Sequence, residues 1–396
     1  MAAMNHLAYD FIAPRKIVFG WGRRREVGAL AAALGHRAFL VEGSRTLAAK
    51  GTLAEIVDFL EQAGVQAVRG LASITREPEV ADVDAAVAWL RHERAGPGDV
   101  IIAVGGGSAI DLAKAAAALA TNLEGDSVKD YLEGVGRGLK IVAPPLPMVA
   151  LPTTGGTGTE ATKNAVISSF DPPYKKSLRS ERMVPRVVLV DPELSVSVPP
   201  ATTAWTGMDA ITQLIESFIC RHAQPIPQAL AVDGLRRAVP AIVEAVRDGA
   251  SRPARESMSH AALLSGMALA NSGLGLAHGV AAALGVHARV AHGLACAVML
   301  PVALRVNRRV RERELAELAR AVWGGAWASD ALAAGAFIDK IDELGDAVGV
   351  PRRLGELGVA GRQIPAIVAA SRGNSMSGNP RDVSDEELTK LLEEML

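Results

Sequence analysis

This chain contains little cysteine, and it has almost no excess of positive over negative charge or the reverse. The 396 residues contain only two cysteines, Cys220 and Cys296, which excludes a disulfide framework and a four-thiolate zinc site. The 42 Lys and Arg residues oppose 43 Asp and Glu residues, giving a formal net charge of −1. Nucleic-acid binding through a basic face depends on phosphate neutralisation, so this balance argues against such a partner.

Signals for export and for membrane insertion are also missing. The first 16 residues lack the continuous apolar core of a signal peptide, so we expect a cytoplasmic protein. Residues 261–288 contain no Asp, Glu, Lys or Arg, and their length would cross a bilayer. They do contain Asn271, His278 and His287 among several glycines. We therefore expect a buried helical core there and no membrane partner.

The first half of the chain alternates short apolar runs with helical patterns. Hydrophobic residues make up 49% of the chain and charged residues 21%, which suits large buried cores and excludes a disordered protein. Runs of β-type residues separated by amphipathic helices are typical of a parallel α/β sheet. The predicted strands lie at residues 17–19, 38–41, 65–68, 99–104, 147–151 and 187–190.

The pattern changes after residue 192. From about residue 202 onward, helix follows helix with few β-branched runs. The length of the chain exceeds what one hydrophobic core usually organises. We therefore predict two domains, an α/β domain over residues 1–192 and an all-helical domain over residues 193–396.

Two glycine-rich loops follow predicted strands of the first half. In the first loop, a strand runs into Gly105, Gly106 and Gly107 and then directly into a helix. Glycines let the backbone approach an anion, and a helix N-terminus supplies free N–H groups, so this arrangement suits a pyrophosphate. The loop lacks the GxGxxG fingerprint, and a tight turn without a ligand is the alternative.

The second loop has the sequence LPTTGGTGTE over residues 151–160. Its four threonine hydroxyls and three glycines offer hydrogen bonds to a ribose or a phosphate. Alone it is weak evidence. Two such loops at the carboxyl ends of strands in one α/β sheet favour a nucleotide site, because ligands bind there in open sheets.

The helical half contains a group of histidines. Five of the eight histidines lie between His222 and His292. Asp209 stands near the start of a predicted helix, with Gln213 four residues later on the same face. His278 precedes His292 by 14 residues in a glycine-rich context. A carboxylate with two imidazoles suits a catalytic divalent metal, although each histidine taken singly is more often a hydrogen-bonded core residue.

Five motifs occur in an order that resembles the iron-containing (group III) alcohol dehydrogenase family: GGGSAIDLAK, PTTGGTGTE, TGMDAITQLIES, LGLAHGVAAALG and AHGLACAVMLP. The resemblance implies a dehydroquinate-synthase-like fold, with an α/β dinucleotide-binding domain and an all-α metal and substrate domain. It also implies a nicotinamide cofactor in the cleft between the domains, one divalent metal (Fe²⁺ or Zn²⁺), and a homodimer or higher homo-oligomer. The implied reaction is hydride transfer between NAD(P)(H) and a small alcohol, aldehyde or ketone.

The same resemblance assigns the site residues. It implies metal ligands at Asp209, Gln213, His278 and His292. The family normally has histidine where Gln213 stands, and glutamine is a weaker ligand for iron or zinc. A family histidine proposed for proton relay is replaced by Ala282, so no catalytic proton donor is assigned. The implied cofactor contacts are Gly43, Ser44, Gly105, Gly106, Gly107, Ser108, Asp111, Thr153, Thr154, Thr157, Asn164 and Lys176, with Lys175 as the alternative to Lys176.

The residues after the second predicted strand bear on which nicotinamide is used. Many NAD-preferring members of the family have an aspartate where Gly43 stands here, and an acidic side chain there pairs with the ribose 2′-OH. Gly43 would leave room, Ser44 would offer a hydroxyl, and Arg45 would pair with a phosphate. We therefore expect NADP(H) to be favoured over NAD(H). Glu42, one residue earlier, is the alternative ribose partner and would reverse this preference.

Three alternative functions stay open beside the dehydrogenase. Related maleylacetate reductases work without a metal, so the glutamine at position 213 permits a metal-independent NAD(P)H reductase of that type. A lyase of the dehydroquinate-synthase type would share the fold, although the dehydrogenase motifs speak against it. A nucleotide-binding protein that has lost its catalytic metal is the third.

Overall fold

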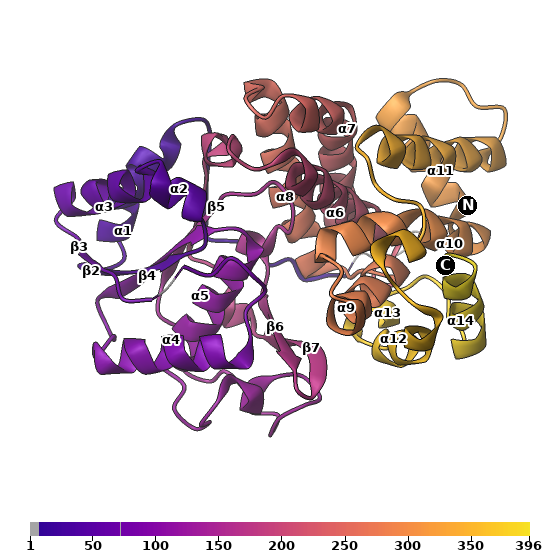
Figure 1. Cartoon of the computed structure of the whole chain (residues 1–396). Coiled ribbons are helices and arrows are strands. Elements are labelled where there is room, and N and C mark those ends of the chain that lie inside the picture. Colours follow the sequence, from indigo (N-terminus) through magenta and orange to yellow (C-terminus); the bar gives the residue numbers. More distant parts are fainter. Residues whose placement is uncertain (1–7, 72) are drawn as a thin grey trace.

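The computed structural model describes residues 8–71 and 73–396, which form an α/β half and a helical half (Figure 1). The α/β half is built on a six-stranded sheet in the order β1-β8-β5-β4-β2-β3, in which every pair of neighbours is parallel. The α/β fold predicted from the sequence is confirmed. The strands are β1 (Lys16–Phe19), β2 (Arg37–Glu42), β3 (Gln66–Val68), β4 (Asp99–Gly105), β5 (Met148–Pro152) and β8 (Val187–Val190).

Helices cover both faces of this sheet (Figure 1). Successive residues of a strand point to opposite faces, so Phe39 and Val41 pack on one side while Ala38 and Leu40 pack on the other. This explains why the central strands are apolar without alternation. One side carries α4 (Val80–His92) and α5 (Gly107–Leu119), and the other carries α1 (Val27–Ala32), α2 (Arg45–Ala49) and α3 (Thr52–Gln62).

A separate antiparallel hairpin was missed by the sequence analysis. It consists of β6 (Asn164–Phe170) and β7 (Pro173–Arg179) and contacts the helix α9 (Leu276–Ala288) of the other half. Strand β6 packs on α5, but Ser168, Lys175 and Lys176 interrupt the apolar pattern along the hairpin, so the sequence did not predict its strands. The hairpin therefore joins the sheet half to the helical half.

The helical half begins at Pro200 and has one continuous apolar core. Proline at the first turn of a helix is favoured because its missing N–H has no helical partner there. The long helix α10 contains Pro301 and is kinked at Arg311. The helices besides α9 are α6 (Pro200–Ile219), α7 (Pro225–Arg247), α8 (Arg252–Asn271), α10 (His292–Trp323), α11 (Asp330–Ala347), α12 (Ile364–Ala370), α13 (Asn374–Ser377) and α14 (Asp385–Glu393).

The uncharged stretch over residues 261–288 is split between α8 and α9, which meet at an angle of 101°. Most of its residues are buried within the helical core. Among the described residues, no single helix has the length and apolar character needed to cross a membrane, although the bent pair together reaches both.

Candidate metal and nucleotide sites

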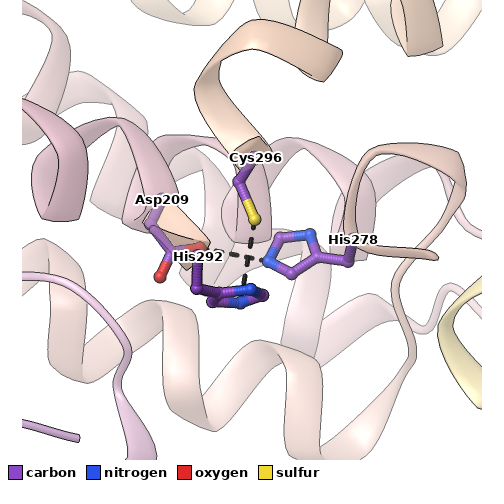
Figure 2. Close-up of side chains that lie close together, drawn as sticks. All are labelled: Asp209, His278, His292 and Cys296. Atoms are coloured by element: carbon purple, nitrogen blue, oxygen red, sulfur yellow. Dashed lines mark hydrogen bonds and ion pairs between the residues drawn. The ribbon is translucent and has the colours of Figure 1, made fainter. Parts of the chain in front are cut away.

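Four side chains of the helical half point toward one centre (Figure 2). Asp209 comes from the middle of α6, His278 from the first turn of α9, and His292 and Cys296 from the first two turns of α10. One potential ligand atom from each lies within 4.8 Å of the others. The structure therefore brings together three of the four predicted metal ligands and adds a thiol that the sequence analysis did not assign.

Two short contacts link these atoms in pairs. The His278 Nε2 atom lies 3.2 Å from Asp209 Oδ1, and the Cys296 Sγ atom lies 3.7 Å from His292 Nε2. The four residues come from α6 and from the consecutive helices α9 and α10, and the packing of these helices around a common core fixes the convergence. Carboxylate oxygen, imidazole nitrogen and sulfur are all common ligands of zinc and similar divalent ions, so the donor set fits such an ion.

The fourth predicted ligand, Gln213, has another partner. It lies one turn after Asp209 on α6 and is buried, but its Oε1 atom accepts a hydrogen bond of 2.7 Å from the Ser265 hydroxyl of α8. Ala282, which stands where the family has a relay histidine, lies one turn after His278 on α9. The position offers no titratable side chain.

Glu216 is a buried carboxylate that holds the start of α9 in place, and the sequence analysis missed it. It accepts hydrogen bonds from the backbone N–H groups of Gly275, at 3.0 Å, and Ala277, at 2.8 Å. Its Oε2 atom also lies 2.7 Å from His278 Nδ1. A carboxylate bound to one imidazole nitrogen leaves the other facing a metal, a common arrangement behind metal-binding histidines. The available signal was its spacing of seven residues from Asp209, two helical turns on the same face.

The electrostatics of the cluster follow from burial and from the groups that surround each imidazole. Burial opposes a charge on His278, but Cys296, Asp209 and Glu216 together raise the pKa of its imidazole well above the ordinary value. Burial and the nearby ammonium of Lys175 lower the pKa of His292 to about 4, so this imidazole is neutral, the form that binds metals. Among the described residues, the buried His292 Nδ1 atom has no hydrogen-bond partner.

The first glycine loop lies at the N-terminus of α5, as the sequence predicts, and its three glycines have different tasks. A Cβ atom added at Gly105 would lie 2.6 Å from Ala109 Cβ, and one at Gly107 would lie 2.7 Å from Thr157 Oγ1. At Gly106 it would meet only the Thr154 side chain, at 3.4 Å. Gly105 and Gly107 are therefore required by packing, whereas the Cβ position of Gly106 has room.

The backbone at Gly106 also favours an anion site. Gly106 is the N-cap of α5 with extended backbone angles (φ −73°, ψ −172°), so a side chain there brings no backbone strain. In the described part of the chain, no side chain caps this helix. The N–H groups of the first turn are thus available to a phosphate group.

The second loop lies beside the first and also touches the helical half. The Thr153 backbone N–H bonds to the Gly105 carbonyl at 3.0 Å, which sets the two loops next to each other. A Cβ atom at Gly156 would lie 2.5 Å from the Thr206 Cβ of α6. Gly158 has a φ of +59° and approaches the backbone of Gly266 in α8. Two of the three glycines thus serve close packing between the halves.

Asp111 and Asn164, both expected to contact the cofactor, belong to a buried network around Lys114. The Lys114 Nζ atom donates to the Thr159 carbonyl at 2.8 Å, to the Thr159 and Thr162 hydroxyls at 2.9 Å, and to the Asn164 carbonyl. One Asp111 oxygen accepts from the Thr159 hydroxyl and the other from a backbone N–H of β6. Both carboxylate oxygens of Asp111 therefore accept hydrogen bonds within the protein, and its direct contact with the cofactor stays a prediction.

Gly43 and Ser44 also have structural tasks at the end of β2. A Cβ atom at Gly43 would lie 2.5 Å from Ala109 Cβ, so the close approach of β2 to α5 requires glycine there. The Ser44 hydroxyl caps α2 by accepting from the Leu47 N–H at 3.2 Å. Glu42 accepts a hydrogen bond of 2.9 Å from Arg69. The expectation that Gly43 makes room for a phosphate thus loses its ground, because packing already explains the glycine.

Lys175 and Lys176 are neighbours on β7, so their side chains point to opposite faces of the hairpin. Lys175 forms an ion pair of 2.5 Å with Glu77, and its charge acts on His292. This places Lys175 on the side of the hairpin that faces the metal-ligand cluster. The choice between Lys176 and Lys175 as the cofactor contact stays a prediction.

Comparison with known proteins matches both halves of the chain to one family. Residues 14–192 match the family model of iron-containing alcohol dehydrogenase, and residues 203–396 match its C-terminal counterpart. The 1,3-propanediol dehydrogenase of Klebsiella pneumoniae is 32% identical over 394 residues, covering 98% of this chain and 99% of that protein.

Two solved structures extend the comparison. A 1,3-propanediol oxidoreductase has a TM-score of 0.91 at 30% identity and covers 98% of this chain and 100% of its own. The sulfoacetaldehyde reductase of Bifidobacterium kashiwanohense, in complex with NAD⁺, has a TM-score of 0.86 at 29% identity and covers 98% of this chain and 99% of its own.

Proposed function

Because the chain belongs to the iron-containing alcohol dehydrogenase family, we propose that its two halves form one active site, with the nicotinamide dinucleotide on α5 and a divalent metal on Asp209, His278 and His292. The enzyme is an oxidoreductase, an alcohol dehydrogenase or aldehyde reductase that transfers hydride between a nicotinamide cofactor and a small alcohol or aldehyde. The observation that carries the proposal is the convergence of the ligand atoms within 4.8 Å.

The metal site depends on how this chain positions its own side chains. A divalent metal bound there would polarise a carbonyl oxygen during reduction or lower the pKa of an alcohol during oxidation. Glu216 holds His278 through Nδ1 and presents Nε2 to the site. Asp209 supplies negative charge. The burial of Asp209 and His278 keeps water away from their ligand atoms. The hydride step itself belongs to the cofactor, while the protein sets orientation and electrostatics.

The cofactor site uses the two loops at the carboxyl ends of β4 and β5. In this proposal the N–H groups of Gly107 and Ser108 bind the pyrophosphate, with the Thr154 and Thr157 side chains beside them. Thr153 stands at the start of the second loop. Lys175, on the side of the hairpin that faces the metal-ligand cluster, replaces Lys176 as the proposed cofactor contact.

The choice between NADP(H) and NAD(H) is a finer proposal. The expectation of NADP(H) now rests on Arg45 alone, since Gly43 packs against α5 and Ser44 caps α2. A carboxylate at Glu42 disfavours a neighbouring 2′-phosphate. The sulfoacetaldehyde reductase described above holds NAD⁺. We therefore propose NAD(H) as the working cofactor, tested by kcat/KM for NADH and NADPH. A clear NADPH preference that Arg45→Ala abolishes would reinstate the first expectation.

The cofactor assignment is tested by Gly106→Val. The added side chain would fill the space that the pyrophosphate needs, so fluorescence titration with NADH should show at least about a hundredfold weaker binding, while thermal unfolding stays near that of the wild type. Gly373→Val is a matched control, because Gly373 is also the N-cap of a helix with similar extended angles (φ −85°, ψ −173°) and free space around it. Normal NADH affinity in Gly106→Val would place the pyrophosphate elsewhere.

Three further expectations, on assembly, location and domain boundary, stay proposals. We propose a homodimer or higher homo-oligomer, a cytoplasmic location, and a domain boundary at residues 192 and 193. Light scattering tests the first, cell fractionation tests the second, and limited proteolysis tests the third.

A further inference from the structure

We propose that Cys296 is a ligand of the metal in this enzyme, so that one carboxylate, two imidazoles and one thiolate hold the ion. This inference rests on the proposed metal site and adds to it a residue that the family motif does not assign. Gln213, at the position of the usual fourth ligand, is then left outside the set.

The geometry of the cluster supports a sulfur ligand. In a tetrahedral zinc site with Zn–S near about 2.3 Å and Zn–N near about 2.0 Å, sulfur and nitrogen ligands are roughly 3.5 Å apart, and nitrogen and oxygen ligands roughly 3.3 Å apart. The Cys296 Sγ atom lies 3.7 Å from His292 Nε2, and His278 Nε2 lies 3.2 Å from Asp209 Oδ1. Both separations already match those of metal ligands to within a few tenths of an ångström.

The position of Cys296 on its helix explains this geometry. It follows His292 by four residues on α10, so the two side chains lie on the same face of the helix, one turn apart. Figure 2 shows the sulfur and both imidazoles directed to the same centre. The residue is fully buried, so its thiol has these groups as its surroundings in place of water.

The alternative fourth ligand is less suitable. The Gln213 Oε1 atom already accepts the Ser265 hydroxyl at 2.7 Å. An amide oxygen is also neutral, whereas a thiol that coordinates a metal loses its proton and brings a full negative charge. Cys296, on α10, would therefore take the place of the histidine that the family normally has at position 213 of α6.

A thiolate ligand changes which metal the site prefers. Soft sulfur ligands favour zinc, and the general affinity order places zinc and cobalt above Fe²⁺ for a given site. A site of one sulfur, two nitrogens and one oxygen should therefore select Zn²⁺ over Fe²⁺ more strongly than the all-nitrogen-and-oxygen set that the motif implies. The wild-type chain is expected to bind zinc when both ions are offered at equal concentration.

Cobalt spectroscopy on the full-length, metal-free protein tests the inference. Co²⁺ bound to a thiolate gives a sulfur-to-metal charge-transfer band in the near ultraviolet, besides the visible d–d bands that any bound Co²⁺ shows. We expect both sets of bands in the wild type. Cys296→Ser should lose the charge-transfer band and keep the d–d bands. Its Zn²⁺ affinity should fall at least about tenfold, because mutation of a residue that only supports a metal ligand already lowers metal affinity by that much.

Two controls separate the possible outcomes. Cys220→Ser removes the other buried cysteine, which bonds to a backbone carbonyl of its own helix, and should keep the charge-transfer band. Gln213→Ala should keep it as well. Visible d–d bands without charge transfer in the wild type would overturn the thiolate ligand and leave the metal site standing. A wild-type protein that takes up no Co²⁺ would overturn both. A band that survives in Cys296→Ser would also refute the inference.

Discussion

Each half of the chain contains a buried polar cluster, and the two differ in what completes them. In the α/β half, the cation is the ammonium group of Lys114. It donates to oxygens of Thr159, Thr162 and Asn164, while Asp111 balances its charge. The helical cluster has converging ligand atoms and the buried His292 Nδ1 that lacks a partner among the described residues.

The difference shows that burial of charge does not by itself identify a functional site. A buried polar group needs partners, and the Lys114 network supplies them from within the protein. The helical cluster instead holds two carboxylates, Asp209 and Glu216, around imidazoles and a thiol. We propose that an external cation completes this cluster, whereas the Lys114 network stabilises the fold without one.

The largest expected effect is on catalysis, from His278→Ala. Loss of this ligand should remove the metal and lower kcat/KM for aldehyde reduction by about a thousandfold or more, because Lewis-acid stabilisation of a transition state amounts to several kcal/mol. Metal analysis and steady-state kinetics measure both effects. The exposed His222 gives a control variant, His222→Ala, that should keep metal and activity. Full activity in His278→Ala would remove the catalytic role of the cluster.

The next effect is on stability, from Lys114→Met. Removing a buried cation leaves Asp111 uncompensated, so the free energy of unfolding should fall by about 3–5 kcal/mol in urea denaturation. The metal content should stay at the wild-type level. A second variant that adds Asp111→Asn should recover part of the loss. If Lys114→Met emptied the metal site of an otherwise folded protein, the two clusters would not be independent.

A smaller effect in the same half depends on pH. Burial raises the pKa of Glu160 to about 7, above the ordinary 4.5, so the folded protein keeps a proton that the unfolded chain releases. This contribution to stability is present below about pH 4.5 and is lost as pH rises through about 7. The loss is at most about 3 kcal/mol. Glu160→Gln stays neutral, so it should be more stable than the wild type at about pH 8 and similar to it at about pH 4.5. Parallel pH profiles of the two proteins would contradict this.

The smallest effect concerns the support of the metal ligands, tested by Glu216→Gln. An amide holds His278 Nδ1 less strongly than a carboxylate, so Zn²⁺ affinity should fall about 10- to 100-fold, the usual range for such supporting groups. Competition with a chelating dye measures it. An unchanged affinity would mean that His278 is oriented by helix packing alone.

The sequence predicted the sheet well because its inner strands β2, β4, β5 and β8 are buried on both faces and therefore form apolar runs. All six strands of the sheet appear within one residue of the predicted ends. The β6–β7 hairpin was missed because polar residues such as Ser168 and Lys175, although buried, break its apolar pattern. Asp209, His278 and His292 were found from motifs of the helical half. Their convergence depends on packing between helices, which spacing along the chain does not reveal.

The residues that the sequence analysis missed or misread are those whose role is a tertiary contact. Glu216 of α6 holds His278 of α9, and Cys296 of α10 faces side chains of both α6 and α9. The spacing of four residues between His292 and Cys296 was visible but had no meaning without the fold. Gly43 looked like space for a phosphate, although Ala109 of α5 fills that space.

The central claim is that the helical cluster holds a catalytic divalent metal, and chelation tests it most directly. Element analysis of the purified protein should find a single equivalent of divalent metal per chain. Removing it with a chelator should abolish NADH-dependent aldehyde reduction, and an equimolar addition of Zn²⁺ should restore it, while circular dichroism shows the same fold throughout. A metal-free protein that reduces aldehyde at the full rate would contradict the claim and establish the metal-independent reductase instead.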